Sequence, residues 1–82
     1  ARKDSLIMLY RVAGKPKTSG SVNFKDVSTK QYKKTSDTYN AILWGSKNKI
    51  TAGYDDGTFR PLDQCLREHI VTFIYRYDKL KK

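Results

Sequence analysis

Arginine stands at two positions where its guanidinium can grip an anion, Arg2 and Arg67. Each begins a segment whose apolar residues recur at helical spacing. At such a position a guanidinium donates two parallel hydrogen bonds to a carboxylate or phosphate, and the helix N-terminus adds positive potential. The competing interpretation is an internal ion pair with an aspartate such as Asp63 or Asp26. The two arginines are therefore the first candidates for ligand contact.

Aromatic and glycine residues supply further candidates, in this case for contact with a sugar. The flat rings of Trp44 and Tyr54 can stack on a sugar ring. Trp44 directly follows Ile42 and Leu43, so packing in a core is the stronger interpretation for that residue. Gly53 is first a turn residue, and its missing side chain can also let a sugar approach the backbone.

The residue types that support catalysis or metal binding are few and poorly spaced. Cys65 and His69 lie one helical turn apart, which is a weak indication of an activated nucleophile. One cysteine and one histidine cannot build a zinc site or an internal disulfide. In a calcium-binding loop with Gly57 at its sixth position, Ala52 and Tyr54 would stand where oxygen ligands are required. The sequence therefore predicts no enzyme, no metal and no cofactor.

The balance of charge points to an anionic partner. The chain has 17 Lys and Arg against 8 Asp and Glu, which gives a formal net charge of +9. The positive field that this charge creates would attract a polyanion, whereas plain solubility accounts for many of the lysines. Nucleic acid is a weaker candidate because the basic residues do not line one helical face. The longest apolar run, Leu6–Tyr10, is far shorter than the roughly 20 residues that span a bilayer.

Three predicted helices carry or connect these residues. Since no strand pattern accompanies them, the sequence predicts an all-α fold. The first helix contains Leu6, Leu9 and Ala13 at helical spacing and is closed by Gly14 and Pro16. The second starts near Thr35 or Ser36, with an inward stripe of Tyr39, Ile42 and Leu43 that is widened by Ala41 and Trp44. The third starts at about Leu66 and has a wide apolar face of Ile70, Val71, Phe73, Ile74 and Tyr77.

Two long loops connect the predicted helices. Residues 15–34 have no sustained period and need isolated apolar residues to pin them to a core, namely Val22, Phe24, Val27 and Tyr32. Residues 47–64 form an ordered connection of several turns, with Tyr54 and Phe59 as its anchors.

The first and last helices are similar in sequence. At an offset of 65 residues, RKDSLIMLYR falls on REHIVTFIYR, with identical residues at Arg2/Arg67, Tyr10/Tyr75 and Arg11/Arg76. Apolar residues also fall at the same positions in the two segments, at Leu6/Val71, Met8/Phe73 and Leu9/Ile74. The chain therefore reads as the last helix of one repeat followed by a complete second repeat. Because repeats cannot bury their hydrophobic faces alone, we expect further copies or self-association to complete the bundle.

Four segments resemble the S-layer homology (SLH) family in order and spacing. They are FKDVS (Phe24–Ser28), AILW (Ala41–Trp44), ITAGYDDGTFRP (Ile50–Pro61) and the helix opening at Arg67. The resemblance divides the chain into the last helix of a preceding repeat (residues 1–14), a linker (15–23), an SLH repeat (24–77) and a basic tail (78–82). It implies two helices joined by a structured loop in each repeat, and a helical bundle formed between repeats.

The resemblance also implies a function. SLH repeats are non-catalytic modules that anchor exported proteins at the bacterial cell surface, by binding anionic secondary cell-wall polysaccharides such as pyruvylated or teichoic-acid-like polymers. It implies a place near the binding groove for Arg67, Arg2 and Asp26, although Asp26 can equally cap its own turn. The alternative function is a protein-interaction or assembly module of a larger surface or phage-type protein.

The chain departs from the family pattern at two places. The family's Thr-Arg-Ala-Glu motif corresponds here to Leu66-Arg67-Glu68-His69, so that only the arginine is kept. The glycine that usually precedes the isoleucine of the following turn is Lys49, and Asn48 is expected to supply left-handed geometry nearby.

Overall fold

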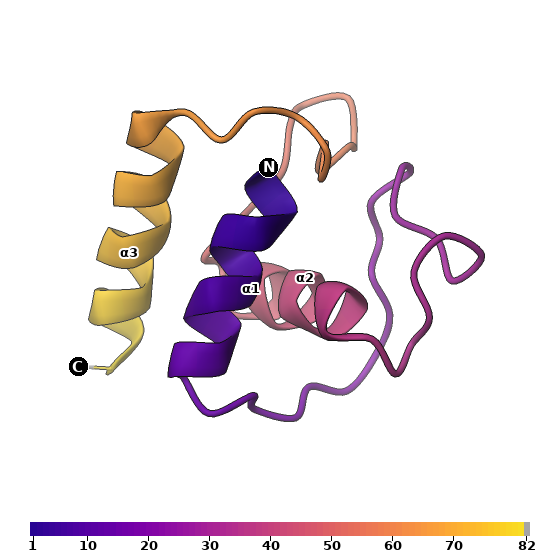
Figure 1. Ribbon diagram of the computed structural model, residues 1–82, viewed down its shortest axis with the longest axis horizontal. Coiled ribbons are helices and arrows are strands. Elements are labelled where there is room, and N and C mark those ends of the chain that lie inside the picture. Colours follow the sequence, from indigo (N-terminus) through magenta and orange to yellow (C-terminus); the bar gives the residue numbers. More distant parts are fainter. Residues whose placement is uncertain (82) are drawn as a thin grey trace.

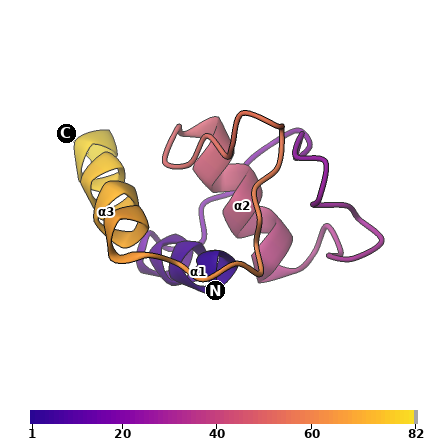
Figure 2. The same cartoon turned by 90° about the horizontal axis from the view of Figure 1, so that it is seen from above.

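Three α-helices joined by two long loops make up the described part of the chain, residues 1–81, in this computed structural model (Figure 1). The helices are α1 (Arg2–Val12), α2 (Asp37–Lys47) and α3 (Arg67–Lys81). No strand occurs among these residues, which confirms the predicted all-α fold. Helix α2 crosses α1 steeply, whereas α3 runs beside α1 in the same direction (Figures 1 and 2).

Helix α2 forms the centre of the core. Its N-cap is Ser36, whose hydroxyl oxygen accepts a hydrogen bond from the Tyr39 amide at 3.1 Å. Asp37 follows in the first turn, where a negative charge is favoured by the helix dipole. The predicted inward stripe is confirmed, because these side chains are all buried: Tyr39, Ala41, Ile42, Leu43 and Trp44.

Helix α1 packs closely across α2 at Gly45. A methyl group at Gly45 would lie about 3.0 Å from a methyl carbon of Leu6, a residue that is itself fully buried. Because Gly45 has no side chain, the two helices approach each other until Leu6 fills the space between them. Gly14 follows α1 with a φ of +89°, and the expected end of the helix is confirmed there.

The loop between α2 and α3 returns to the beginning of α1. Ile50 and Phe59 anchor this loop in the core with fully buried side chains. Its backbone carbonyls then cap α1, because the Arg2 amide donates to Asp63 O at 2.9 Å and the Lys3 amide donates to Pro61 O at 3.0 Å. Helix α1 and the loop between α2 and α3 therefore fold as one unit.

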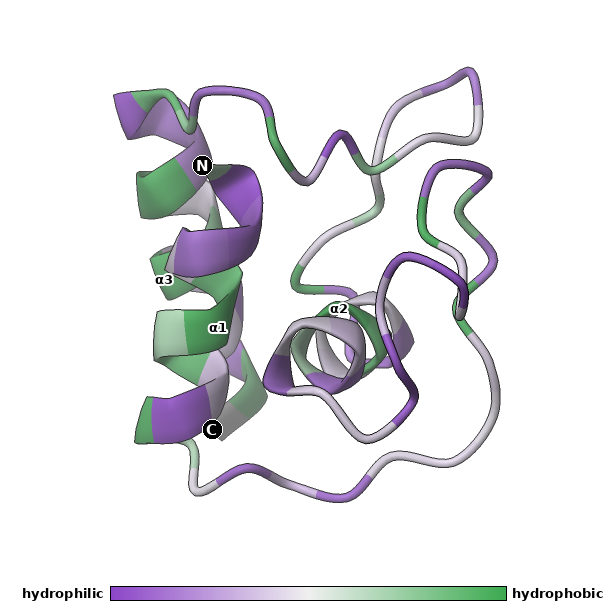
Figure 3. Cartoon of the chain, turned by 45° about the vertical axis from the view of Figure 1, so that its right-hand side comes forward, coloured by the Kyte–Doolittle hydropathy of each residue, from purple (hydrophilic) through white to green (hydrophobic). Residues whose placement is uncertain are grey.

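Residues 15–34 wrap around the outside of α2. Val27 is buried, and Val22, Phe24 and Tyr32 pack against the core, as the sequence predicts. Figure 3 shows that most of this loop is hydrophilic, while hydrophobic residues gather on the helices. The left-handed residue after α2 is Lys49, with a φ of +60°, so the expectation that Asn48 takes this conformation is wrong.

The wide apolar face predicted for α3 is only partly covered. Phe73 is buried against α1, and the Tyr77 ring meets the Trp44 ring of α2 with centroids 5.8 Å apart. Val71 and Ile74, in contrast, are exposed. The apolar sides of the two similar helices are therefore not buried to the same extent. Helix α1 is covered by α2 and by the loop that follows α2. No equivalent helix and loop cover α3 among the described residues.

Candidate functional site

A pocket of about 170 Å³ lies between the segment Thr51–Tyr54 and one face of α3. Arg2, from the first turn of α1, forms part of its wall. The polar side chains around it belong to Arg2, Thr51, Tyr54, His69, Thr72 and Arg76. We call it the Arg2 pocket. Two arginines and no carboxylate line it, so its chemistry favours an anionic group.

The guanidinium of Arg2 is buried without an acidic partner. Its Nε donates to Phe59 O at 3.0 Å, and only 4% of the residue is exposed. The centroids of the Tyr54 and Phe59 rings lie 4.9 Å from its Cζ, and that of Phe73 lies at 5.5 Å. No ion pair among residues 1–81 includes Arg2. A buried cation usually has a carboxylate partner, so this one leaves an unmatched positive charge beside the pocket.

Two further groups in the wall are poised for polar contact. The Thr51 hydroxyl is buried and has no hydrogen-bond partner in the described part of the chain. A buried hydroxyl without a partner is costly, and a ligand or a water in the pocket would offer one. On the opposite wall, Arg76 Nη1 donates to Ile50 O at 3.4 Å, which ties α3 to the loop across the pocket.

His69 lies at the N-terminal end of the same wall. Its Nδ1 accepts a hydrogen bond from the Leu66 amide at 3.4 Å, and its ring meets the Tyr54 ring edge-on, with centroids 6.5 Å apart. The imidazole is therefore held over the pocket by the start of α3 and by the loop.

Comparison with known protein families supplies the family. The model of the S-layer homology domain matches residues 23–70, which is more than half of the chain. The chain belongs to the S-layer homology domain family. Comparison with curated proteins and with solved structures gave no match.

Domains of the S-layer homology family are non-catalytic modules that anchor proteins to the cell wall, and their presence implies association with the bacterial cell surface. In the part of the chain that the structure describes, no three or more His, Cys, Asp or Glu side chains gather where a metal ion could be held. None of the three helices combines the length and the hydrophobicity that crossing a membrane requires.

The fold brings three of the predicted site residues to the Arg2 pocket, namely Arg2, Gly53 and Tyr54. Gly53 has a φ of +73°, and a methyl group there would collide with the Phe24 ring and with Thr58 O. Its missing side chain is therefore required by internal packing. The ring of Tyr54 is covered on one side by the Arg60 guanidinium, whose Cζ lies 3.9 Å from its centroid.

The other three predicted residues lie elsewhere. Arg67 is exposed at the start of α3 and is not part of the pocket wall. Asp26 holds the loop, because its two carboxylate oxygens accept hydrogen bonds from the Phe59 amide at 2.9 Å and the Arg60 amide at 2.8 Å. Trp44 is buried in the core beside Tyr10, and its ring offers no face to a ligand in this structure.

Four wall residues were not singled out as ligand contacts from the sequence: Thr51, His69, Thr72 and Arg76. The last three stand at i, i+3 and i+7, which places them on one side of a helix. This spacing could have found them. Thr51 carries no such signal, since its burial depends on the approach of Gly45 and the loop.

Proposed function

We propose that the chain is a non-catalytic anchoring module that binds an anionic secondary cell-wall polysaccharide through the Arg2 pocket. The observation that carries this proposal is the buried, unpaired guanidinium of Arg2 beside a pocket without carboxylates. A pyruvate ketal or a phosphodiester would supply the missing negative charge. Arg76 on the opposite wall would supply a second cation to the same group.

Binding at one pocket is expected to be weak. A hydrogen bond to a charged group contributes about 1.5–3 kcal/mol, and two or three of them are largely offset by the cost of association. Anchoring of a large protein would then depend on several pockets acting together along one polymer.

Further copies of the repeat are the partners that this arrangement requires. On α1, Leu6 and Tyr10 are 0% and 6% exposed because α2 and its loop cover them. The matching residues on α3, Val71 and Tyr75, are 60% and 59% exposed. We propose that α1 is the last helix of a preceding repeat, and that the middle helix and loop of a following repeat cover α3 in the same way.

The proposed repeat arrangement assigns a binding role to Arg67 as well. It matches Arg2 at the offset of 65 residues, and it is exposed in the part of the chain that the structure describes. The loop of a following repeat would enclose Arg67 as the present loop encloses Arg2. A second pocket for the polymer would form there.

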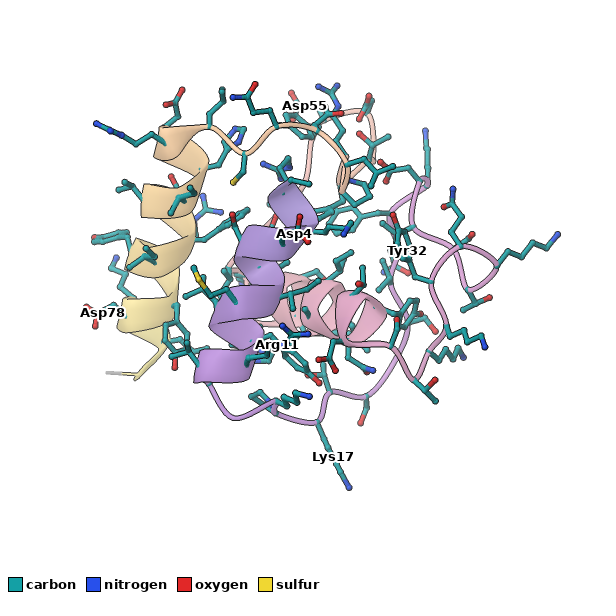
Figure 4. The ribbon with its side chains drawn as sticks, in the orientation of Figure 1. Asp4, Arg11, Lys17, Tyr32, Asp55 and Asp78 are labelled. Carbon is teal, nitrogen blue, oxygen red and sulfur yellow. The ribbon has the colours of Figure 1, made fainter. Side chains whose placement is uncertain are left out.

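The test is sedimentation with purified bacterial cell walls, using beads coated with the chain so that weak contacts act together. Walls are used before and after acid extraction of the secondary polymer. Arg2→Met removes the charge and leaves a side chain that fits between aromatic rings, so the fold is expected to persist and binding to be lost. Lys17→Met is the matched control, because Lys17 is exposed and points away from the body of the molecule (Figure 4). Binding that survives extraction would refute polymer recognition.

The exposed side of α3 supports a second candidate, an assembly module of a larger surface or phage-type protein. Its apolar residues are the kind that dock against another protein surface. In the wall assay this candidate predicts binding that is insensitive both to extraction and to Arg2→Met.

A further inference from the structure

A second hollow, of about 280 Å³, adjoins the Arg2 pocket. Its wall is formed by Asn48, Lys49, Arg76, Lys79 and Leu80. Arg76 belongs to the walls of both hollows, and Lys49 and Thr51 lie two residues apart on the facing segment. The two hollows therefore lie next to each other between α3 and residues 48–54, with Arg76 between them, and together we call them the α3 groove.

One side of α3 supplies a regular row of polar side chains to this groove. His69, Thr72, Arg76 and Lys79 follow at intervals of three, four and three residues, which is the spacing of a single helix face. At 1.5 Å per residue the row is about 15 Å long. A groove of this length exceeds what one carboxylate or phosphate can occupy.

The charge in the α3 groove is of one sign. Arg2, Lys49, Arg76 and Lys79 line it, and no carboxylate does. Among residues 1–81 none of these four cations takes part in an ion pair. Asp78 is close in sequence, but it follows Arg76 by two residues and therefore projects from the far side of the helix, as Figure 4 shows.

Helix dipoles explain part of this cluster, since Lys49 follows the end of α2 and Lys79 lies in the last turn of α3. They do not explain the conformation of Lys49. Its φ of +60° is unfavourable for any residue with a side chain, and a glycine would adopt it without cost. The position thus carries a positive charge in spite of backbone strain, and strained residues of this kind concentrate at functional sites.

We propose that the α3 groove binds a second anionic group of the same polymer, which Lys49 and Lys79 contact while the first group occupies the Arg2 pocket. The ligand is then a chain with repeated negative charges, not a single charged sugar. This inference rests on the proposed function, because it extends the site at the Arg2 pocket.

Two series of defined anions test the proposal by isothermal titration at low salt. One is oligogalacturonates of one to eight units, which carry a carboxylate on each sugar, and the other is glycerol phosphate chains of the same lengths. The variant is Lys49→Gly combined with Lys79→Ala, which removes both charges and the backbone strain. The control is Lys33→Ala combined with Lys34→Ala, which removes two charges from the exposed outer loop.

The parent chain is expected to bind the longer members of at least one series more tightly than the monomer. The groove variant should bind the longest chain about fivefold more weakly and the monomer unchanged, since each exposed ionic contact contributes modestly. The control should match the parent. Equal loss in both double variants would overturn the proposal, as would affinity that does not rise with chain length in either series. The proposed function would still be judged separately, by loss of wall binding in Arg2→Met.

Discussion

Gly53 shows how strongly a single backbone position supports the pocket. The residue has a φ of +73°, and a methyl group would lie 2.4 Å from Phe24 Cε1 and 2.7 Å from Thr58 O. Gly53→Ala should therefore destabilise the chain by about 2–4 kcal/mol, through strain and collision together. Urea unfolding measures the change.

Gly14→Ala is the matched control for that prediction. Gly14 has a φ of +89°, but nothing lies within 4 Å of the added methyl group. Its substitution should cost about 1–2 kcal/mol from backbone conformation alone. If both variants lost the same stability, the packing of Phe24 on Gly53 would not be what requires a glycine there.

Lys49 is the residue at which stability and binding are expected to oppose each other. Because its φ of +60° strains a side-chain-bearing residue, Lys49→Gly should raise the free energy of unfolding by about 1 kcal/mol. The urea midpoint should increase while the slope of the transition stays constant. Lys47→Gly, at the end of α2 and also exposed, should lower stability instead, because glycine is a poor helix residue. A loss of stability in Lys49→Gly would show that its side chain compensates for the strain.

At the scale of the elements, ion pairs tie the end of α1 to the start of α2. Asp37 Oδ2 lies 3.1 Å from Lys15 Nζ and 3.2 Å from Arg11 Nε. The hydrogen bond from Lys15, with that from Arg11, holds the pKa of the Asp37 carboxyl below its ordinary value. The carboxyl also stands in the first turn of α2, where the helix dipole favours its charged form.

This arrangement predicts a pH dependence of stability. Since the pKa of Asp37 is lower in the folded chain, its contribution is present at neutral pH and is lost as the pH falls from about 4 through the folded value. Asp37→Asn should therefore be less stable than the parent at pH 7 and equally stable at the acidic end of a urea titration series. The difference should shrink in high salt, because the pair is open to solvent. A gap between the two chains that is constant with pH would contradict this explanation.

The sequence predicted the helices because their signals are local. Ser36 marks the start of α2 and Gly14 follows the end of α1 as expected, since caps and turns depend on neighbouring residues. The exposure of Val71 and Ile74 was not predicted, because periodicity shows that a helix has an apolar side but not what covers it.

Part of the candidate site was also predictable from the sequence. Arg2, Gly53 and Tyr54 were candidates from helix position, turn chemistry and family resemblance, and they line one pocket. The spacing of His69, Thr72 and Arg76 shows that they share one side of a helix, but which segment that side faces depends on how α3 packs beside α1. Asp26 illustrates the same limit, since its bonds to the amides of Phe59 and Arg60 span more than thirty residues.

At the scale of the whole molecule, the uncovered side of α3 determines how the chain should behave in solution. Leu9 on α1 is 7% exposed, and its match on α3, Ile74, is 47% exposed. On the proposed arrangement, each repeat carries on its last helix the surface that the next repeat covers. We expect this exposed apolar side of α3 to be covered by association with other copies of the chain.

Sedimentation velocity over a range of concentrations should therefore show the chain associating as concentration rises. Val71→Glu should shift the equilibrium toward the monomer, because it places a charge in the centre of the apolar side of α3. Leu62→Glu is the control, since Leu62 is as exposed as Val71 but lies in the loop before α3. A parent chain that stays monomeric at every concentration, or equal effects of the two substitutions, would mean that α3 is not the surface on which repeats meet.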